Sequence, residues 1–285
     1  NTFGKSCVAM QVPIRKNGKL VGYVDTPTKV AKSYNTDGAA TEIPIPEELK
    51  DLVEEIHESL CEVVAESDDA LMEKFFAGEP FTADEILRGL KKAINDLHLA
   101  PVLVGSSYDN VGVREIADYI VKYLPSPAER EILAQNEQGE EIQVPADPNG
   151  PAAAFIFKTI ADPFIGKLSL FRVYSGTIKS DMVLVNDRNG TEERMTQVFN
   201  LRGKKQLPQD GIVAGDIGAV AKLSKAATGD TLCAKGHIIH MPKIKFPKPQ
   251  LTMAIAPKAK GDEEKISAGL SKLMEEDKTF SFGLN

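Results

Sequence analysis

The segment from residue 155 to residue 233 constrains the fold of this chain most, because short strand-like runs alternate there with glycine, proline and aspartate. A first run at 155–158 and a second at 168–178 flank a turn, and Gly-Asp corners follow at Asp216 and Asp230. We interpret both aspartates as turn residues, because the side chain of aspartate hydrogen-bonds its own backbone in turns. Short β-rich runs between such turn residues are typical of a small closed barrel.

The composition is that of a globular protein with more than one domain. The chain has 285 residues, enough for two or three domains with cores of their own. No apolar run has the length of a membrane span, and the first residues show no signal-peptide pattern. The three cysteines, Cys7, Cys61 and Cys233, are far apart and form no Cys-x-x-Cys pair, so neither a disulfide framework nor a zinc site is indicated. We expect a reducing, cytoplasmic environment.

Charge is divided unevenly along the chain. Residues 1–150 hold 14 basic and 27 acidic residues, a net charge of −13, whereas residues 151–250 hold 15 basic and 8 acidic residues, a net charge of +7. Residues 251–285 carry −1. The basic segment is suited to a phosphate backbone and the acidic one is not. Solvated surface is the alternative explanation for both.

The first third of the chain predicts a hairpin followed by helices. The Asn-Gly pair at 17–18, inside the strand-like region 3–34, is a strong hairpin signal. Helices are predicted over 47–66, after a proline that suits a helix start, and over 69–76. A capping box that starts at Thr82 opens another helix.

The helix predicted over 47–66 is amphipathic. Its apolar residues recur at helical spacing and are expected to pack inward: Leu49, Leu52, Val53, Ile56, Leu60, Val63 and Val64. Its opposite face is acidic and is expected to face outward: Glu54, Glu55, Glu58 and Glu62.

A strand, a loop and a helix are predicted next. Residues 101–104 predict a buried strand, residues 105–108 a tight polar loop, and residues 113–123 a helix. The apolar residues of this helix are expected on one inward face: Val113, Ile116, Ala117, Ile120 and Val121.

The histidines do not form a predicted site. His237 and His240 lie three apart in an extended segment, so their side chains are expected to face opposite ways, with no carboxylate or thiol near them. We interpret His57, on the acidic helix, as a surface residue. We therefore predict no metal site.

Several phrases in the chain resemble bacterial elongation factor G. The run from Asp162 to Gly176, together with 228–233, closely resembles the second domain of that family. Residues 71–75 and 78–82 resemble the insertion within its GTPase domain, and the Tyr-Leu-Pro-Ser-Pro phrase at 123–127 resembles the end of that domain. The resemblance covers nearly the whole chain, and the barrel phrases are the most specific.

The resemblance implies an α+β multidomain fold. An α/β inserted subdomain with the last strand, loop and helix of a GTPase domain would occupy 1–127. Residues 128–150 are charged and contain Pro145, Pro148 and Gly150, and we interpret them as a linker. The β-barrel, domain II of translation factors, would occupy 151–247. The start of a ferredoxin-like βαβ domain would occupy 248–285, with a strand at 250–258, a helix with Ile266, Leu270 and Leu273 inward, and a further strand from Phe280. We interpret the chain as an engineered or proteolytic fragment of a longer parent.

The phosphate-binding motifs of such a GTPase are missing from the sequence. Gly4-Lys5-Ser6 ends like a P-loop, but the first glycine would precede residue 1, and residues 7–14 read as a strand. No Asn-Lys-x-Asp motif occurs, and we interpret the two Asp-x-x-Gly matches, at 109–112 and 187–190, as turns. GTP and magnesium are therefore expected in the full-length parent and not in this fragment, which we predict to be catalytically inactive and monomeric.

The resemblance also implies three contact surfaces. The loop that contacts the guanine base in the family corresponds here to Ser106, Ser107 and Tyr108, where serine and tyrosine replace the family's alanine and phenylalanine. The basic barrel would contact small-subunit ribosomal RNA, and its candidate phosphate contacts are Arg172, Lys179, Arg202, Lys204 and Lys205. The acidic helix, through Glu54, Glu55, Glu58 and Glu62, would contact the large-subunit stalk protein, and a merely solvated helix face is the alternative.

The function implied is GTP-dependent movement of tRNA and mRNA on the ribosome. The first alternative is a related GTPase that recycles ribosomes or protects them from antibiotics, which the acidic insertion disfavours. The second is an adaptor that binds RNA or protein without GTPase ancestry in use.

Overall fold

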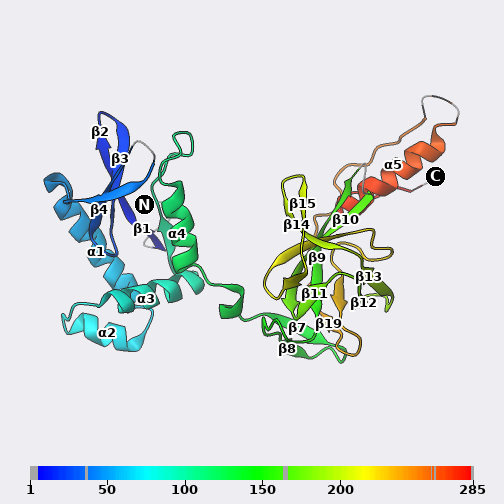
Figure 1. Cartoon of the computed structure of the whole chain (residues 1–285), viewed down its shortest axis with the longest axis horizontal. Helices are drawn as coiled ribbons and strands as arrows, with labels where there is room; N and C mark the ends of the chain where they lie inside the picture. The colour runs from blue at the N-terminus through cyan, green and yellow to red at the C-terminus, as the bar shows by residue number, and fades with distance from the viewer. Residues whose placement is uncertain (1–5, 36–37, 163–165, 258, 260, 284–285) are drawn as a thin grey trace. The chain divides into compact units, whose positions relative to one another are not determined.

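The computed structural model describes residues 6–35, 38–162, 166–257, 259 and 261–283 (Figure 1). The chain divides into two compact units, Asn1–Pro125 (unit 1) and Ser126–Asn285 (unit 2), which are described separately. No described helix has the length and apolar character that a membrane span requires.

Unit 1 contains a four-stranded antiparallel meander. Its strands follow one another in sequence order: β2 (Gln11–Lys16), β3 (Lys19–Asp25), β4 (Val30–Tyr34) and β5 (Ala40–Ile43). The β2–β3 turn has positive φ at both central residues, 52° at Asn17 and 77° at Gly18. A type I′ turn requires that geometry, and the predicted hairpin is confirmed.

The helices of unit 1 begin and end close to the predicted positions. They are η2 (Glu47–Leu49), α1 (Lys50–Ala65), α2 (Asp69–Phe76) and α3 (Ala83–Asn95). The capping box is present, because Thr82 Oγ1 accepts a hydrogen bond from Glu85 N and Glu85 Oε2 accepts one from Thr82 N. The apolar stripe of α1 packs inward through Val53, Leu60 and Val64, but Leu52 is exposed, in contrast to the prediction.

A parallel two-stranded sheet and a helix complete unit 1. The sheet joins β1 (Cys7–Ala9) to β6 (Ala100–Val102), and α4 (Val113–Tyr123) follows. The strand prediction at 101–104 is correct in type, but Val102 is exposed rather than buried, because β6 has β1 as its single partner strand among the described residues.

The buried face of α4 differs from the predicted one. Four of the five residues expected to face inward are exposed large hydrophobics, and the fifth is also exposed: Val113, Ile116, Ile120, Val121 and Ala117. Tyr119 and Tyr123 are buried instead, and the Tyr119 hydroxyl hydrogen-bonds Asp25 and the carbonyl of Met10. Helical spacing identified an apolar stripe, but the face that packs into the core of unit 1 is the one that carries Tyr119 and Tyr123.

Unit 2 is built on a curled eight-stranded sheet. Its spatial order is β13-β12-β18-β9-β10-β17-β14-β15, and a separate pair, β11-β16, lies beside it. The strands run as follows: β9 (Ala153–Asp162), β10 (Gly166–Ser175), β11 (Thr177–Lys179), β12 (Met182–Asn186), β13 (Glu192–Met195), β14 (Val198–Arg202), β15 (Lys205–Pro208), β16 (Gly211–Val213), β17 (Ile217–Ala221) and β18 (Thr231–Cys233). The predicted barrel is confirmed.

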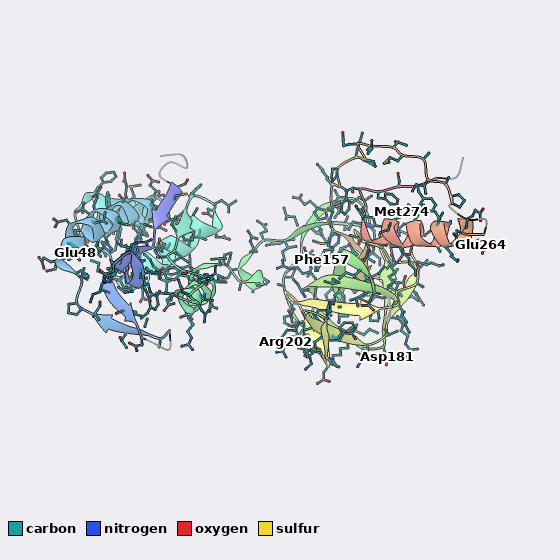
Figure 2. All side chains as sticks on the ribbon, turned by 90° about the horizontal axis from the view of Figure 1, so that it is seen from above. Glu48, Phe157, Asp181, Arg202, Glu264 and Met274 are labelled. Carbon is teal, nitrogen blue, oxygen red and sulfur yellow. The ribbon has the colours of Figure 1, made fainter. Side chains whose placement is uncertain are left out.

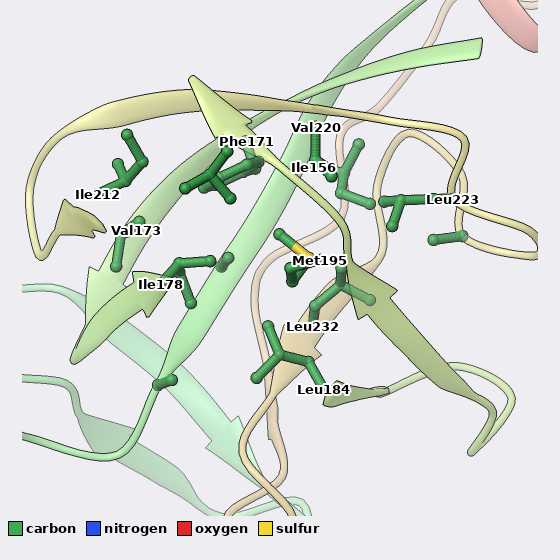
Figure 3. Packing of buried hydrophobic residues seen from close by; sticks show 14 residues of the cluster. Ile156, Phe171, Val173, Ile178, Leu184, Met195, Ile212, Val220, Leu223 and Leu232 are labelled. Carbon is green, nitrogen blue, oxygen red and sulfur yellow. The ribbon is translucent and has the colours of Figure 1, made fainter. Parts of the chain in front are cut away.

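The barrel encloses a tightly packed apolar core (Figure 3). Phe171 and Val173 of β10 alternate with outward-facing residues, as the period of two in a strand requires. They meet Ile178 from β11, Leu184 from β12 and Leu232 from β18, and all five side chains are fully buried. Burial of a large apolar side chain contributes about 2 kcal/mol, so this cluster contributes substantially to the barrel's stability.

Gly176 joins β10 to β11 at a point where no side chain fits. Its φ is +74°, and a Cβ placed there would lie 2.7 Å from both Ala152 Cα and the carbonyl oxygen of Gly150. Gly176→Ala is therefore expected to destabilise unit 2 by about 3 kcal/mol, measured by urea unfolding.

The matched control is Gly203→Ala, at φ +61° with open space around it, which should cost only the backbone strain of about 1 kcal/mol. Equal losses for the two variants would refute the close approach at Gly176.

The range 128–150 contains more structure than the expected linker. After η3 (Pro127–Glu129), the strands β7 (Leu133–Asn136) and β8 (Glu141–Gln143) form a hairpin. The hairpin pairs with β19 (Ile239–His240) in a three-stranded sheet of order β19-β7-β8. Ala134 and Val144 are buried with Phe155 and Met241, so the segment is packed into unit 2. Pro145, Pro148 and the surrounding charges suggested a connector, whereas tertiary packing gives the hairpin.

The C-terminal region forms its helix but not its flanking strands. α5 (Glu263–Glu276) matches the predicted helix, with Ile266 and Leu270 half-buried and Leu273 exposed. Residues 250–257 and 280–283 form no strand, contrary to the prediction, and residue 258 lies outside the described residues. A strand needs a partner for its backbone groups, and no described strand pairs with these segments.

Candidate functional site

The loop expected to contact a guanine base is closed by its own hydrogen bonds. Ser106 and Val111 exchange two backbone bonds of 2.8 and 2.9 Å, and the Ser106 hydroxyl donates to Asp109 Oδ2 at 2.7 Å. Ser107 and Tyr108 stand at the tip, and Tyr108 is 97% exposed. The Ser106 hydroxyl is already hydrogen-bonded to Asp109, so contacts to a guanine base would come from Ser107 and Tyr108.

The stem of this loop is held by a residue that sequence reasoning missed. Val104 N donates a hydrogen bond of 3.0 Å to the side-chain oxygen of Gln11, which is 2% exposed on β2. Gly112, at φ 78°, lies against Gly105, because a Cβ on Gly112 would be 2.9 Å from Gly105 Cα and 2.5 Å from the Val104 carbonyl. Gln11 lies 93 residues from Val104, and no local pattern connects them.

The four glutamates of α1 are exposed, as predicted. Glu54 is engaged within the unit, since both its carboxylate oxygens accept hydrogen bonds from Lys29 Nζ, at 2.7 and 2.8 Å. The hydrogen bond from Lys29 holds the pKa of Glu54 below its usual value. Glu55, Glu58 and Glu62 are also exposed on this face.

His57 is not the surface residue that the sequence suggested. Its Nδ1 lies 2.8 Å from the carbonyl oxygen of Thr26, and its Nε2 lies 3.5 Å from Cys61 Sγ. The imidazole therefore bridges α1 to the turn after β3, with the residue half-buried.

Among the described residues, no group of three or more His, Cys, Asp or Glu side chains is arranged to hold a metal ion.

The candidate phosphate contacts of the barrel fall into one group and two separate residues. Arg202, Lys204 and Lys205 are exposed together at the tip of the β14–β15 hairpin. Figure 2 labels Arg202. Arg172 lies on β10, half-buried, with its guanidinium 5.6 Å from the Tyr174 ring centroid. Lys179 is exposed. It lies near the opposite end of β14, since the Oγ of the neighbouring Ser180 accepts a hydrogen bond from Val198 N. The structure thus gathers three of the five candidates.

Asp230 is a buried ion-pair partner and not only a turn residue. Its carboxylate accepts bonds from Arg188 Nε at 2.7 Å, Asn186 Nδ2 at 2.8 Å and Ala227 N at 2.9 Å. Burial alone would raise the pKa of Asp230, but hydrogen bonds from Arg188, Asn186 and Ala227 hold it below its usual value. The hydrogen bond from Ala227 N, three residues earlier, agrees with the predicted role of Asp230 as a turn residue.

Glu193 closes the turn that follows β17. Its Oε1 accepts from Lys225 N at 2.6 Å and Ala226 N at 2.7 Å, and its Oε2 accepts from Ser224 N at 2.9 Å. Burial opposes its ionisation, yet these backbone N–H groups and the Ser224 hydroxyl lower the pKa of Glu193. Sequence reasoning missed this residue, whose partners lie more than thirty positions away.

A carboxylate lies beside His240, contrary to the prediction. Asp187 Oδ2 is 3.0 Å from His240 Nδ1, and Asp187 Oδ1 accepts a bond of 2.7 Å from Thr231 N. The contact ties β19 to the turn after β12. His237, three residues earlier, is exposed and lines a pocket that is described below.

Two sequence families match unit 2. Elongation factor G domain 2 matches residues 151–235, and elongation factor G domain III matches residues 246–285. A crystal structure of a protein from Thermus thermophilus is similar over 99% of this chain, with a TM-score of 0.83 and 27% sequence identity. The chain is elongation factor G-like. It spans 40% of the length of the Thermus thermophilus protein.

The domain 2 match of this elongation factor G-like chain contains the features described above for the barrel. All five candidate phosphate contacts and both buried carboxylates, Asp230 and Glu193, lie within it. The domain III match contains α5 and the segments around it. The loop at 106–108 and the acidic helix lie before both matches, so their roles rest on the resemblance alone.

Proposed function

We propose that this chain is part of a ribosome-binding translational GTPase that resembles elongation factor G and acts in the cytoplasm. The full protein would promote GTP-dependent movement of tRNA and mRNA on the ribosome. One observation carries the proposal: domain 2 and domain III of elongation factor G match the chain in tandem, at 151–235 and 246–285. The charge asymmetry supports it, since the barrel region is basic and the preceding region acidic.

The proposal is tested with the full-length protein in a toeprinting assay on ribosomes that carry tRNA in a pre-translocation state. We expect a shift of the messenger RNA that requires GTP. Ribosome splitting without this shift would favour the recycling alternative. GTP-independent binding without either activity would favour an adaptor and overturn the proposal.

GTP and magnesium would be held mainly by parts that this chain does not supply. The motifs that contact phosphates and magnesium are missing from its sequence, and those contacts dominate nucleotide affinity in such enzymes. Residues 4 and 5 of the P-loop-like Gly4-Lys5-Ser6 lie outside the described residues, and β1 follows with Cys7. Ser107 and Tyr108 would contribute a base contact in the parent.

We therefore expect the 285-residue chain alone to bind no GTP at micromolar concentration. Isothermal calorimetry with magnesium and GTP is the measurement, and the full-length protein is the positive control. Heat of binding to the chain alone at micromolar GTP would show that the loop region holds the nucleotide unaided.

The acidic face of α1 would receive the mobile stalk protein of the large subunit. Between residues 51 and 87 the chain holds twelve acidic residues and a single lysine, so phosphate would be repelled and a basic protein surface attracted. Glu54 is paired with Lys29, and Glu55, Glu58 and Glu62 are exposed on the same helix and add to its negative charge.

Replacing Glu55, Glu58 and Glu62 with glutamine in the full-length protein should slow stalk-dependent GTP turnover several-fold at low salt. Opposite charge mainly accelerates association, so the effect should shrink as salt is raised. Glu73→Gln with Glu79→Gln, at exposed acids outside α1, is the control and removes two charges where the test variant removes three. If turnover on stalk-containing ribosomes is unchanged at low salt, α1 is only a solvated face.

A further inference from the structure

Unit 2 contains a pocket that the proposed function does not use. The pocket has a volume of about 400 Å³ and lies between the β7–β8 hairpin, the start of β9 and the loop at 236–239. Its apolar lining comes from both sides: Ile142, Val144, Pro145, Pro151, Ile238 and Ile239. An apolar cavity of roughly 150 Å³ holds a benzene molecule, so this pocket has room for one or two bulky apolar side chains.

Ile142 and Gln143 of β8 line this pocket, and the outer edge of β8 has no partner strand among the described residues. The sheet order is β19-β7-β8, so β8 is an edge strand (Figure 1). Val144 N donates to Ile132 O and Asn136 N donates to Glu140 O, which orients the backbone of the even-numbered residues toward β7. In an antiparallel pair the intervening residues then direct their N–H and C=O groups away from the partner. These residues are Glu141 and Gln143, and Gln143 also lines the pocket.

The rim of the pocket is acidic. Residues 129–147 hold six acidic residues and one basic residue, Arg130. Glu137 and Asp147 line the pocket directly, and both are exposed. A positively charged ligand is favoured here, in contrast to the barrel as a whole.

We propose that β8 and this pocket form a docking site for a basic, extended peptide segment of a partner protein. The segment would add a strand to the free edge of β8, with its backbone bonded to Glu141 and Gln143. One bulky apolar side chain of the segment would enter the pocket, and its lysines or arginines would lie near Glu137 and Asp147. A free edge, a side-chain-sized pocket and an acidic rim occur together here, and an extended basic peptide is the ligand that meets all three.

The test uses the 285-residue chain and fluorescence anisotropy. The probe is a fluorescein-labelled peptide that alternates lysine with valine and carries one central phenylalanine. We expect saturable binding that weakens with salt. Gln143→Pro removes an edge N–H without removing a bond to β7, and it should weaken binding about tenfold or more. Gln143→Ala keeps the N–H and should bind within about twofold of the unchanged chain.

Two peptide controls keep the test decisive if Gln143→Pro disturbs folding, which thermal melting would report. The same peptide N-methylated at both its lysines and its valines cannot donate strand bonds from either edge. The same peptide with glutamate for lysine opposes the acidic rim. Both should fail to bind. Equal binding of either control, or no binding of the lysine peptide, would overturn the proposal.

Discussion

Glu193→Ala is expected to destabilise unit 2 by about 4 kcal/mol. The substitution leaves the backbone N–H groups of Ser224, Lys225 and Ala226 without their acceptor in a site where the glutamate is 2% exposed. Each buried donor without a partner costs about 1–3 kcal/mol, and backbone relaxation recovers part of the sum. Urea unfolding at neutral pH measures the loss.

The neighbouring residue is the matched control. Glu192 is exposed, and its Oε1 lies 3.6 Å from Lys235 Nζ in an ion pair open to solvent. Glu192→Ala should change the stability by less than about 0.5 kcal/mol, because exposed pairs contribute little. If both variants lose the same amount, the turn at 224–226 does not depend on Glu193.

The same carboxylates predict how the barrel responds to acid. The folded-state pKa values of Glu193 and Asp230 are lowered, so each contributes stability that is fully present above its unfolded-state pKa of about 4. That stability is lost as the pH falls through the lowered folded-state values. Stability should therefore decline below about pH 4.5, and Glu193→Ala should make this decline shallower.

Neutralising the hairpin tip is expected to give the largest loss of ribosome affinity. The variant replaces Arg202, Lys204 and Lys205 with glutamine in the full-length protein. If each side chain neutralises one phosphate, the slope of log affinity against log salt should fall by about 2–3. Ribosome affinity should drop about a hundredfold at moderate salt. Filter binding to ribosomes at several salt concentrations measures both.

Three other exposed lysines supply the control for the hairpin. Lys243, Lys245 and Lys248 follow β19, away from the β14–β15 tip in sequence, and their replacement by glutamine removes the same charge. This control should alter the slope by less than about 1. Equal slopes for the two triple variants would mean that net charge alone, and not the hairpin, governs binding.

Local signals predicted the local structure well. The Asn17-Gly18 turn and the capping box at Thr82 are specified by a few adjacent residues, and both occur as expected. The barrel was predicted because glycine, proline and aspartate separate short β-rich runs, and because 162–176 and 228–233 resemble the second domain of elongation factor G. The hairpin at 133–143 was missed because what stabilises it is packing against Phe155 and Met241, far along the chain.

Long-range partners explain what the sequence did not predict. The helical period alone identified an apolar stripe on α4, but it did not identify the face with Tyr119 and Tyr123, where Tyr119 bonds Asp25, 94 residues away. Asp230 was predicted only as a turn residue and Glu193 was not singled out, because Asp230 bonds Asn186 from 44 positions away and Glu193 bonds Ser224 from 31. The candidate contact residues were found through family resemblance, and the structure adds that three of them share one hairpin tip.

The most direct test of the ribosome-binding account is a radical probe tethered to that tip. Lys204→Cys in a full-length protein, with the exposed Cys7 replaced by serine, would carry an iron chelate that cleaves nearby RNA. We predict cleavage confined to a few neighbouring sites of small-subunit ribosomal RNA when the protein is bound with GTP. Absence of cleavage on ribosomes that demonstrably hold the protein, or cleavage only in large-subunit RNA, would contradict it.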